Sequence, residues 1–142
     1  MERAHAVLHE PGERMARKRI LLAEDDPSIL KMTKLRLEYE GFDVIVATDG
    51  SQAIEQAMAN GGLDLILMDI RMPKLDGLQV CQHLKADPAT ANIPIIVFTA
   101  STGRWQSLAD RCLELGVEDW LKKPFTSREL LGKIHRVLGE TP

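Results

Sequence analysis

The stretch LILMDIRMPKLDG, residues 65–77, joins an apolar run to a single carboxylate and then ends abruptly. Four apolar residues precede Asp69, and Pro73 and Gly77 follow it. Continuous apolar runs are typical of the central strands of a parallel sheet, because helices cover both faces of such a sheet. Burying a carboxylate at the end of that strand is unfavourable unless a group nearby needs its charge. The stretch therefore predicts a buried strand that brings Asp69 to a functional site.

Four other segments have the character of strands, since they are rich in branched residues and bounded by Gly, Pro or Asp. The predicted strands are residues 20–23, 42–48, 63–69, 93–100 and 117–122. Helix-period patterns alternate with them, and four helices have start signals at Pro27, Asp49-Gly50, Asp76-Gly77 and Thr126. Five strands alternating with five helices predict an α/β fold with right-handed crossovers and a parallel sheet covered on both faces.

Composition limits the classes of function. The chain has 142 residues, 44% of them hydrophobic, which suits one domain and leaves no room for a second. Its net charge of −3, with both signs interspersed, disfavours binding to nucleic acid or to a membrane surface. No apolar run approaches the roughly 18 residues of a membrane span, and no signal-peptide core is present. Cys81 and Cys112 lack metal-ligand spacing and are typical of reduced thiols, so we expect a cytoplasmic protein.

The N-terminal residues differ from the rest of the chain. Residues 1–18 are polar, are broken by Pro11-Gly12, and have no strand or long helix pattern. They predict a flexible N-terminal extension ahead of a folded domain at residues 19–142. His5 and His9 have the spacing of neighbours on a helix, but a metal site is not expected in such a segment.

Charged and hydroxyl side chains follow the predicted strands at their carboxyl ends, where open parallel sheets bind ligands. These residues are Glu24, Asp25 and Asp26 after strand 1, Asp69 on strand 3, Thr99 on strand 4, and Lys122 and Lys123 after strand 5. A strand order of 2-1-3-4-5 makes strands 1 and 3 neighbours. Glu24, Asp25 and Asp69 should then converge on one acidic pocket, flanked by a hydroxyl and an ammonium group.

Such a pocket points to a metal ion and to phosphoryl transfer. Two carboxylates about 4 Å apart repel each other by roughly 4 kcal/mol at an effective dielectric constant of 20. Mg²⁺ removes the conflict, because it binds few protein carboxylates and leaves coordination positions for phosphate oxygens. An Asp nucleophile, a metal, a cation and a hydroxyl are the groups that phosphoryl transfer to a carboxylate requires. Asp69 is the natural acceptor.

Four motifs carry a resemblance to a known family. LLAEDDP, LILMDIRMPKLDG, VFTAS and GVEDWLKKPF occur in this order from residue 21 to residue 125. They resemble the motifs of the receiver domain of two-component response regulators, and the resemblance covers about residues 18–139. It implies a flavodoxin-like, doubly wound fold with five parallel strands in the order 2-1-3-4-5.

The resemblance also implies roles for the acidic residues. Asp69 matches the phosphoacceptor, and Glu24 and Asp25 match the acidic pair that holds Mg²⁺, with Asp25 as the more direct ligand. Arg71 matches the residue whose backbone carbonyl completes the metal coordination. Asp26 falls one position later, and we interpret it as an N-cap for the helix that begins at Pro27.

Three further residues match the switching and catalytic positions of the family. Thr99 matches the switch hydroxyl, and Lys123 matches the lysine before Pro124. Trp120 matches the switch aromatic, which is usually Tyr or Phe in this family. Because of that departure, Trp120 has two interpretations that stay open here: a moving switch residue or a fixed packing aromatic.

The function implied by the resemblance is a phosphorylation-dependent signalling switch. A histidine kinase or phosphotransfer protein would donate the phosphoryl group to Asp69. The surface formed by strand 4, strand 5 and the fifth helix would then bind or release a downstream protein. We expect a stand-alone receiver that is not a turnover enzyme, unless this chain is a piece of a longer regulator.

Two other classes of function share parts of the pattern. An Asp-nucleophile phosphatase usually has a second Asp two residues after the first, whereas this chain has Arg71 there. A nucleotide- or flavin-binding module would need a glycine-rich loop after strand 1, and Glu24-Asp25-Asp26 would repel its phosphates unless a metal intervened.

Overall fold

Residues 17–100 and 103–140 are described by the computed structural model, and they alternate between strands and helices. The elements are β1 (Arg19–Ala23), α2 (Pro27–Tyr39), β2 (Asp43–Ala47), α3 (Gly50–Ala59), β3 (Leu65–Asp69), α4 (Gly77–Ala86), β4 (Ile95–Thr99), α5 (Gly103–Glu114), β5 (Asp119–Lys122) and α6 (Ser127–Leu138). The five predicted strands are confirmed, and their observed ends lie within two residues of the predicted ones.

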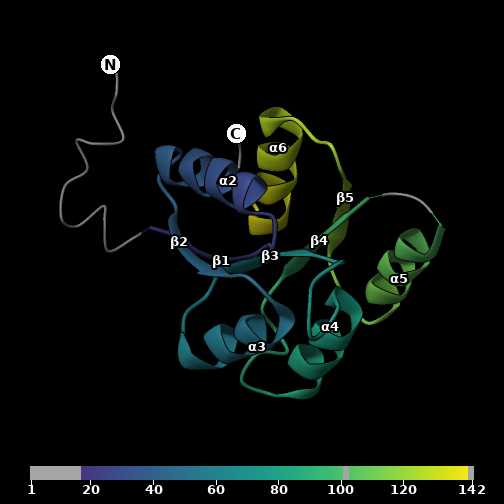
Figure 1. Ribbon diagram of the computed structural model, residues 1–142. Coiled ribbons are helices and arrows are strands. Elements are labelled where there is room, and N and C mark those ends of the chain that lie inside the picture. The colour runs from purple at the N-terminus through teal and green to yellow at the C-terminus, as the bar shows by residue number, and fades with distance from the viewer. Residues whose placement is uncertain (1–16, 101–102, 141–142) are drawn as a thin grey trace.

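The five strands form one parallel sheet in the order β2-β1-β3-β4-β5, as predicted. Helices α2 and α6 cover one face, and α3, α4 and α5 cover the other (Figure 1). Strand order reverses between β1 and β3, which lie side by side with Ile20 opposite Leu65. The carboxyl ends of β1 and β3 therefore meet at the edge of the sheet where a ligand is expected.

Two apolar layers hold the helices against the sheet. Successive side chains of a strand point to opposite faces, and both faces of this sheet are buried. In β3, Ile66 and Met68 pack with α3, α4 and α5, whereas Leu65 and Leu67 pack with α2 and α6. All four side chains are fully buried, which explains why the sequence of this strand is continuously apolar rather than alternating.

The predicted helix starts are confirmed by capping hydrogen bonds. Asp26 caps α2 by accepting hydrogen bonds from the N–H groups of Ser28 and Ile29, as its interpretation as an N-cap requires. Asp49 caps α3 in the same way, and Asp76 and Thr126 form reciprocal capping boxes at α4 and α6. These bonds are local, so each helix start is determined within a few residues of sequence.

The predicted N-terminal extension lies outside the described residues, apart from its last two, and its boundary stays a prediction. Arg17 and Lys18 contact the start of β2: Arg17 Nη1 lies 3.3 Å from Asp43 Oδ1, and the Lys18 carbonyl accepts a hydrogen bond from the Asp43 N–H. His5 and His9 lie outside the described residues as well. None of the helices within 17–100 and 103–140 has the length and apolar character needed to cross a bilayer.

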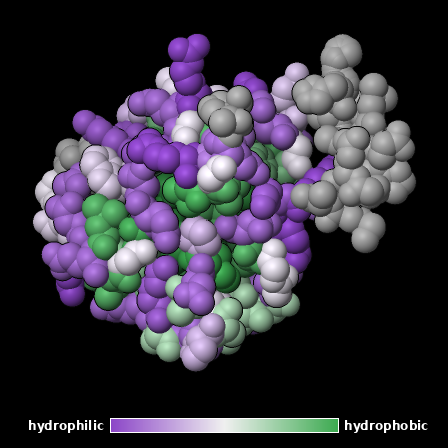
Figure 2. Space-filling view, turned by 180° about the vertical axis from the view of Figure 1, so that it is seen from behind, coloured by the Kyte–Doolittle hydropathy of each residue, from purple (hydrophilic) through white to green (hydrophobic). Residues whose placement is uncertain are grey.

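On the face shown in Figure 2, hydrophilic residues surround smaller apolar areas. Both cysteines belong to the interior, because Cys81 on α4 and Cys112 on α5 are buried free thiols, in agreement with the prediction. The apolar residues of this chain are thus mainly used in the two layers that flank the sheet.

Candidate functional site

Three carboxylates meet at the carboxyl edge of the sheet. Glu24 and Asp25 directly follow β1, Asp69 ends β3, and one carboxylate oxygen from each residue lies within 4.8 Å of the others. Glu24 is fully buried and Asp69 is 6% exposed, whereas Asp25 is exposed. The three side chains converge as predicted, because β1 and β3 are hydrogen-bonded neighbours.

Lys123 joins the two buried carboxylates. Its Nζ atom lies 2.7 Å from Glu24 Oε1 and 2.7 Å from Asp69 Oδ2. Its backbone N–H donates a hydrogen bond to the carbonyl of Thr99, which fixes the residue at the end of β5. Lys122, the neighbouring candidate, is exposed. Of the two lysines after strand 5, the fold therefore directs Lys123 into the acidic site.

The remaining oxygens of the buried carboxylates are oriented by backbone groups. The Arg71 N–H donates to Asp69 Oδ1 over 3.0 Å, and the Asp26 N–H donates to Glu24 Oε2 over 3.2 Å. Each carboxylate is thus held by one backbone donor and by the shared ammonium group. This arrangement keeps both carboxylates in place without saturating their lone pairs, since each oxygen can accept more than one bond.

Burial perturbs the ionisation of the pair that Lys123 bridges. Burial, reinforced by the charge of Asp69 and opposed by the hydrogen bond from Lys123, raises the pKa of Glu24 from 4.5 to about 7. Burial alone would lower the pKa of Lys123, but its hydrogen bonds to Asp69 and Glu24 outweigh burial and raise that pKa. Lys123 therefore stays protonated near neutral pH, whereas Glu24 gains or loses its proton in this pH range.

The donor set fits a hard divalent cation. With all groups ionised, three carboxylates and one ammonium leave excess negative charge in a largely buried site. Oxygen ligands of this kind suit Mg²⁺, which takes one or two carboxylates and keeps other coordination positions for water or phosphate. Among the described residues, Glu24, Asp25 and Asp69 form the group whose spacing could hold a metal ion.

Thr99 and Trp120 lie on neighbouring strands beside the acidic site. Thr99 ends β4 and is fully buried, and its register partner on β5 is Lys122. Trp120 is half-buried, lies opposite Val97, and packs against the apolar layer beneath α3, α4 and α5. The predicted neighbourhood of the two strands is confirmed, whereas movement of the Trp120 ring stays a prediction.

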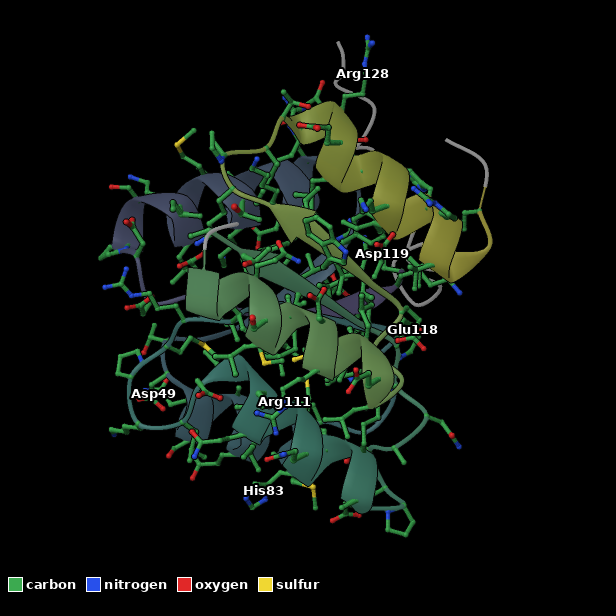
Figure 3. All side chains as sticks on the ribbon, turned by 90° about the vertical axis from the view of Figure 1, so that its right-hand side faces the viewer. Asp49, His83, Arg111, Glu118, Asp119 and Arg128 are labelled. Atoms are coloured by element: carbon green, nitrogen blue, oxygen red, sulfur yellow. The ribbon has the colours of Figure 1, made fainter. Side chains whose placement is uncertain are left out.

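A charged cluster next to Trp120 was missed from the sequence. Lys133 Nζ on α6 lies 3.0 Å from Asp119 Oδ1 and 5.8 Å from the centroid of the Trp120 ring. Figure 3 shows Asp119 between β5 and α6. The helix that begins after Thr126 was predicted, but the partner of the Lys133 charge depends on how α6 packs on β5.

Comparisons with known proteins agree with this geometry. A profile of the response regulator receiver domain matches residues 20–135. Response regulator ArlR of Staphylococcus saprophyticus is 35% identical over 124 residues, which cover 87% of this chain and 54% of the relative. Transcriptional regulatory protein CpxR of Escherichia coli is 41% identical over 120 residues, covering 84% of this chain and 49% of the relative. The chain thus spans about half the length of these curated relatives.

Solved structures show the same likeness. The receiver domain of a sensor histidine kinase from Pseudomonas aeruginosa, which has a magnesium ion coordinated in its active-site cleft, is 35% identical with a TM-score of 0.77. The match covers 87% of this chain and 99% of that one. A CheY-like receiver domain from Methanospirillum hungatei is 28% identical with a TM-score of 0.78, covering 87% of this chain and 94% of that one.

Proposed function

Because this chain belongs to the response regulator receiver domain family of two-component systems, we propose that it is a signalling switch controlled by phosphorylation of Asp69. The observation that carries the proposal is the position of the Asp69 carboxylate, which shares a cation-sized acidic pocket with Glu24 and Asp25 and lies 2.7 Å from the Lys123 ammonium. A nucleophile, an ammonium group and a set of metal ligands are thereby combined at the carboxyl edge of the sheet.

Each residue of the site has a role that follows from its position. Glu24, Asp25, Asp69 and the backbone carbonyl of Arg71 would hold Mg²⁺. When bound, the cation offsets the charge of the carboxylates and of the incoming phosphoryl oxygens. The Arg71 N–H, bonded to Asp69 Oδ1, orients the carboxylate so that one oxygen faces the donor.

Lys123 and Thr99 act on the phosphoryl group once it is attached. The bond from the donor nitrogen to phosphorus breaks as a carboxylate oxygen of Asp69 forms the new bond to phosphorus. Lys123 then binds a phosphoryl oxygen in place of a carboxylate oxygen, and the Thr99 hydroxyl supplies a second donor. The product remains on the protein, so this is a switch rather than a turnover enzyme.

The phosphodonor would be a histidine kinase or a phosphotransfer protein, and α2 offers a surface for it. A pocket of about 360 Å³ lies between α2 and the segment that connects β5 to α6, and Lys123 is among its lining residues. Large apolar side chains continue this surface along α2 and are 71%, 56% and 58% exposed at Met32, Leu35 and Tyr39. An apolar helix of a donor protein docked there would lie next to Lys123, whose Nζ is 2.7 Å from Asp69 Oδ2.

The downstream partner would be a protein that recognises the surface formed by β4, β5 and α6, the fifth helix. Trp120 and the Asp119–Lys133 pair belong to this surface. Asp119 and Trp120 lie on β5, which pairs with β4, the strand that ends at Thr99. We do not assign it a nucleic-acid partner, because the net charge is −3. The buried free thiols suit a reducing compartment, and we propose a cytoplasmic location.

The experiment that tests this function is labelling with acetyl phosphate and Mg²⁺, followed by intact-mass measurement. Wild-type protein should gain one phosphoryl group that is stable to acid and labile to base, and Asp69→Asn should gain none. Asp76→Asn is the matched control, because Asp76 caps α4 and Asn is an equally good N-cap. Labelling of Asp69→Asn at the wild-type level would contradict the assignment.

A further inference from the structure

The segment between β3 and α4 carries Arg71 and has an unusual backbone. The Ile70 carbonyl accepts a hydrogen bond from the Gly77 N–H, and the Pro73 carbonyl accepts one from the Leu75 N–H, both over 2.8 Å. The bond across Lys74 closes a three-residue turn, and Lys74 has φ 70°. A side-chain-bearing residue in this conformation is strained, so its surroundings must hold it there.

The N-terminal end of α3 supplies that restraint. The Gly50 N–H donates to the Pro73 carbonyl over 3.2 Å, and Lys74 Nζ lies 3.5 Å from Asp49 Oδ2. Asp49, labelled in Figure 3, is the N-cap of α3 and is 7% exposed. A hydrogen bond and an ion pair thus join the start of α3 to two consecutive residues, Pro73 and Lys74, in the segment that follows Arg71.

At Gly50 the two segments are in close contact. A Cβ atom at this position would lie 2.1 Å from the Leu75 carbonyl oxygen and 2.6 Å from Leu75 Cβ. Neither distance is possible between non-bonded atoms, and the carbonyl cannot swing away as the end of a side chain would. Any residue larger than glycine at position 50 must therefore displace the backbone at Leu75.

We propose that Gly50 is a positioning residue for the cation site: its close packing holds residues 73–75, and through them the Arg71 carbonyl, at the edge of the acidic pocket. The proposal rests on the proposed function, in which that carbonyl completes the Mg²⁺ ligands. Arg71 is already tied to Asp69 Oδ1 through its N–H, so the segment is held at its start by Asp69 and further along by α3.

The expected consequence of losing this support is a weaker metal site in a protein that still folds. Groups that orient metal ligands typically change metal affinity by about tenfold to a hundredfold when they are mutated. Gly50→Ala should therefore weaken Mg²⁺ binding about tenfold or more. A purely structural role would lower the melting temperature of the variant and leave the Mg²⁺ affinity of the folded protein unchanged.

The test is a calorimetric Mg²⁺ titration of the full chain well below its melting temperature. Gly61→Ala is the matched control, because a Cβ atom at Gly61 meets nothing within 4 Å. The same samples, without Mg²⁺, give the amide resonance of Arg71 by NMR. We expect weaker binding and a shifted Arg71 resonance in Gly50→Ala, and wild-type behaviour in Gly61→Ala.

Leu75→Gly is the second variant, used also in case Gly50→Ala does not fold. It removes the Leu75 side chain that packs on Gly50 and gives position 75 the backbone freedom of glycine without adding bulk, so the restraint on residues 73–75 is weakened and Mg²⁺ affinity should fall. Wild-type affinity in either folded variant overturns the proposal. If the wild-type protein itself does not bind Mg²⁺, the proposed cation site fails. The Arg71 resonance then decides separately: a shift in Gly50→Ala supports positioning, and an unshifted resonance overturns it.

Discussion

Replacing Glu24 by Gln should remove a pH dependence of stability that is built into the metal-free site. Burial raises the pKa of Glu24 from 4.5 to about 7 in the folded protein. Between these values the folded protein retains a proton that the unfolded chain has released. The free energy of unfolding therefore falls as the pH rises through this range. The stabilising contribution is fully present below pH 4.5 and is lost above about pH 7.

The size of the effect follows from the shift. A difference of one pKa unit between the folded and unfolded states corresponds to about 1.4 kcal/mol in the free energy of unfolding. The shift of Glu24 therefore corresponds to about 3 kcal/mol. The lowered pKa of Asp49, which arises mainly from its hydrogen bond with the Gln52 N–H, acts only below its ordinary value of 3.8. The raised pKa of Lys123 acts only above its ordinary value of 10.5. Neither interferes near neutral pH.

The assay is urea unfolding with a chelator present, at several values from about pH 5 to about pH 8. Across this range wild-type protein should lose most of that contribution, roughly 2 to 3 kcal/mol, and Glu24→Gln should lose much less. Glu55→Gln, which removes an exposed carboxylate on α3, should keep the wild-type slope. The histidines are common to all three proteins. Equal slopes for wild type and Glu24→Gln would refute the assignment of the shift to Glu24.

Two further predictions concern the cation and the switch. Saturating Mg²⁺, at a concentration about 100 times Kd, should add roughly 2.7 kcal/mol to the free energy of unfolding. Asp25→Ala should raise the metal-free melting temperature, by relieving carboxylate repulsion, and abolish the Mg²⁺ shift; an equal Mg²⁺ response in calorimetry would exclude Asp25 as a ligand. In a Trp105→Phe background, the fluorescence lifetime of Trp120 should change when beryllofluoride and Mg²⁺ are added, and Thr99→Ala should suppress that change. A change that survives Thr99→Ala would break the proposed coupling.

The local features of this protein were determined by short stretches of sequence. The apolar run before Asp69 predicted a strand covered on both faces, and β3 is fully buried along its length. Asp26 was interpreted as an N-cap rather than a ligand, and it bonds to the first amides of α2. Such features depend on hydrogen bonds and side-chain periodicity within a few residues, so the sequence contains the information that they need.

The contrast between Glu24 and Asp25 required the tertiary structure. Both are adjacent acidic residues after the same strand, yet Glu24 is fully buried with a raised pKa and Asp25 is exposed. Their difference arises in the assembled fold, where burial raises the pKa of Glu24 and the group that opposes this rise, Lys123, follows Glu24 by 99 residues. From the residues alone, either Lys122 or Lys123 could have supplied the ammonium group of the site, and the resemblance favoured Lys123. The fold exposes the first and turns the second inward.

The restraint on the segment after β3 also came only from the tertiary structure. Gly50 was predicted to open a helix, which it does, but its contact with Leu75 could not be read from either stretch. Local sequence determined where each helix and strand begins, because local hydrogen bonds decide that. Contacts between distant residues depend on strand order and on how closely the helices pack against the sheet. Three features are therefore properties of the assembled fold: the burial of Glu24, its ion pair with Lys123, and the contacts of α3 with residues 73–75.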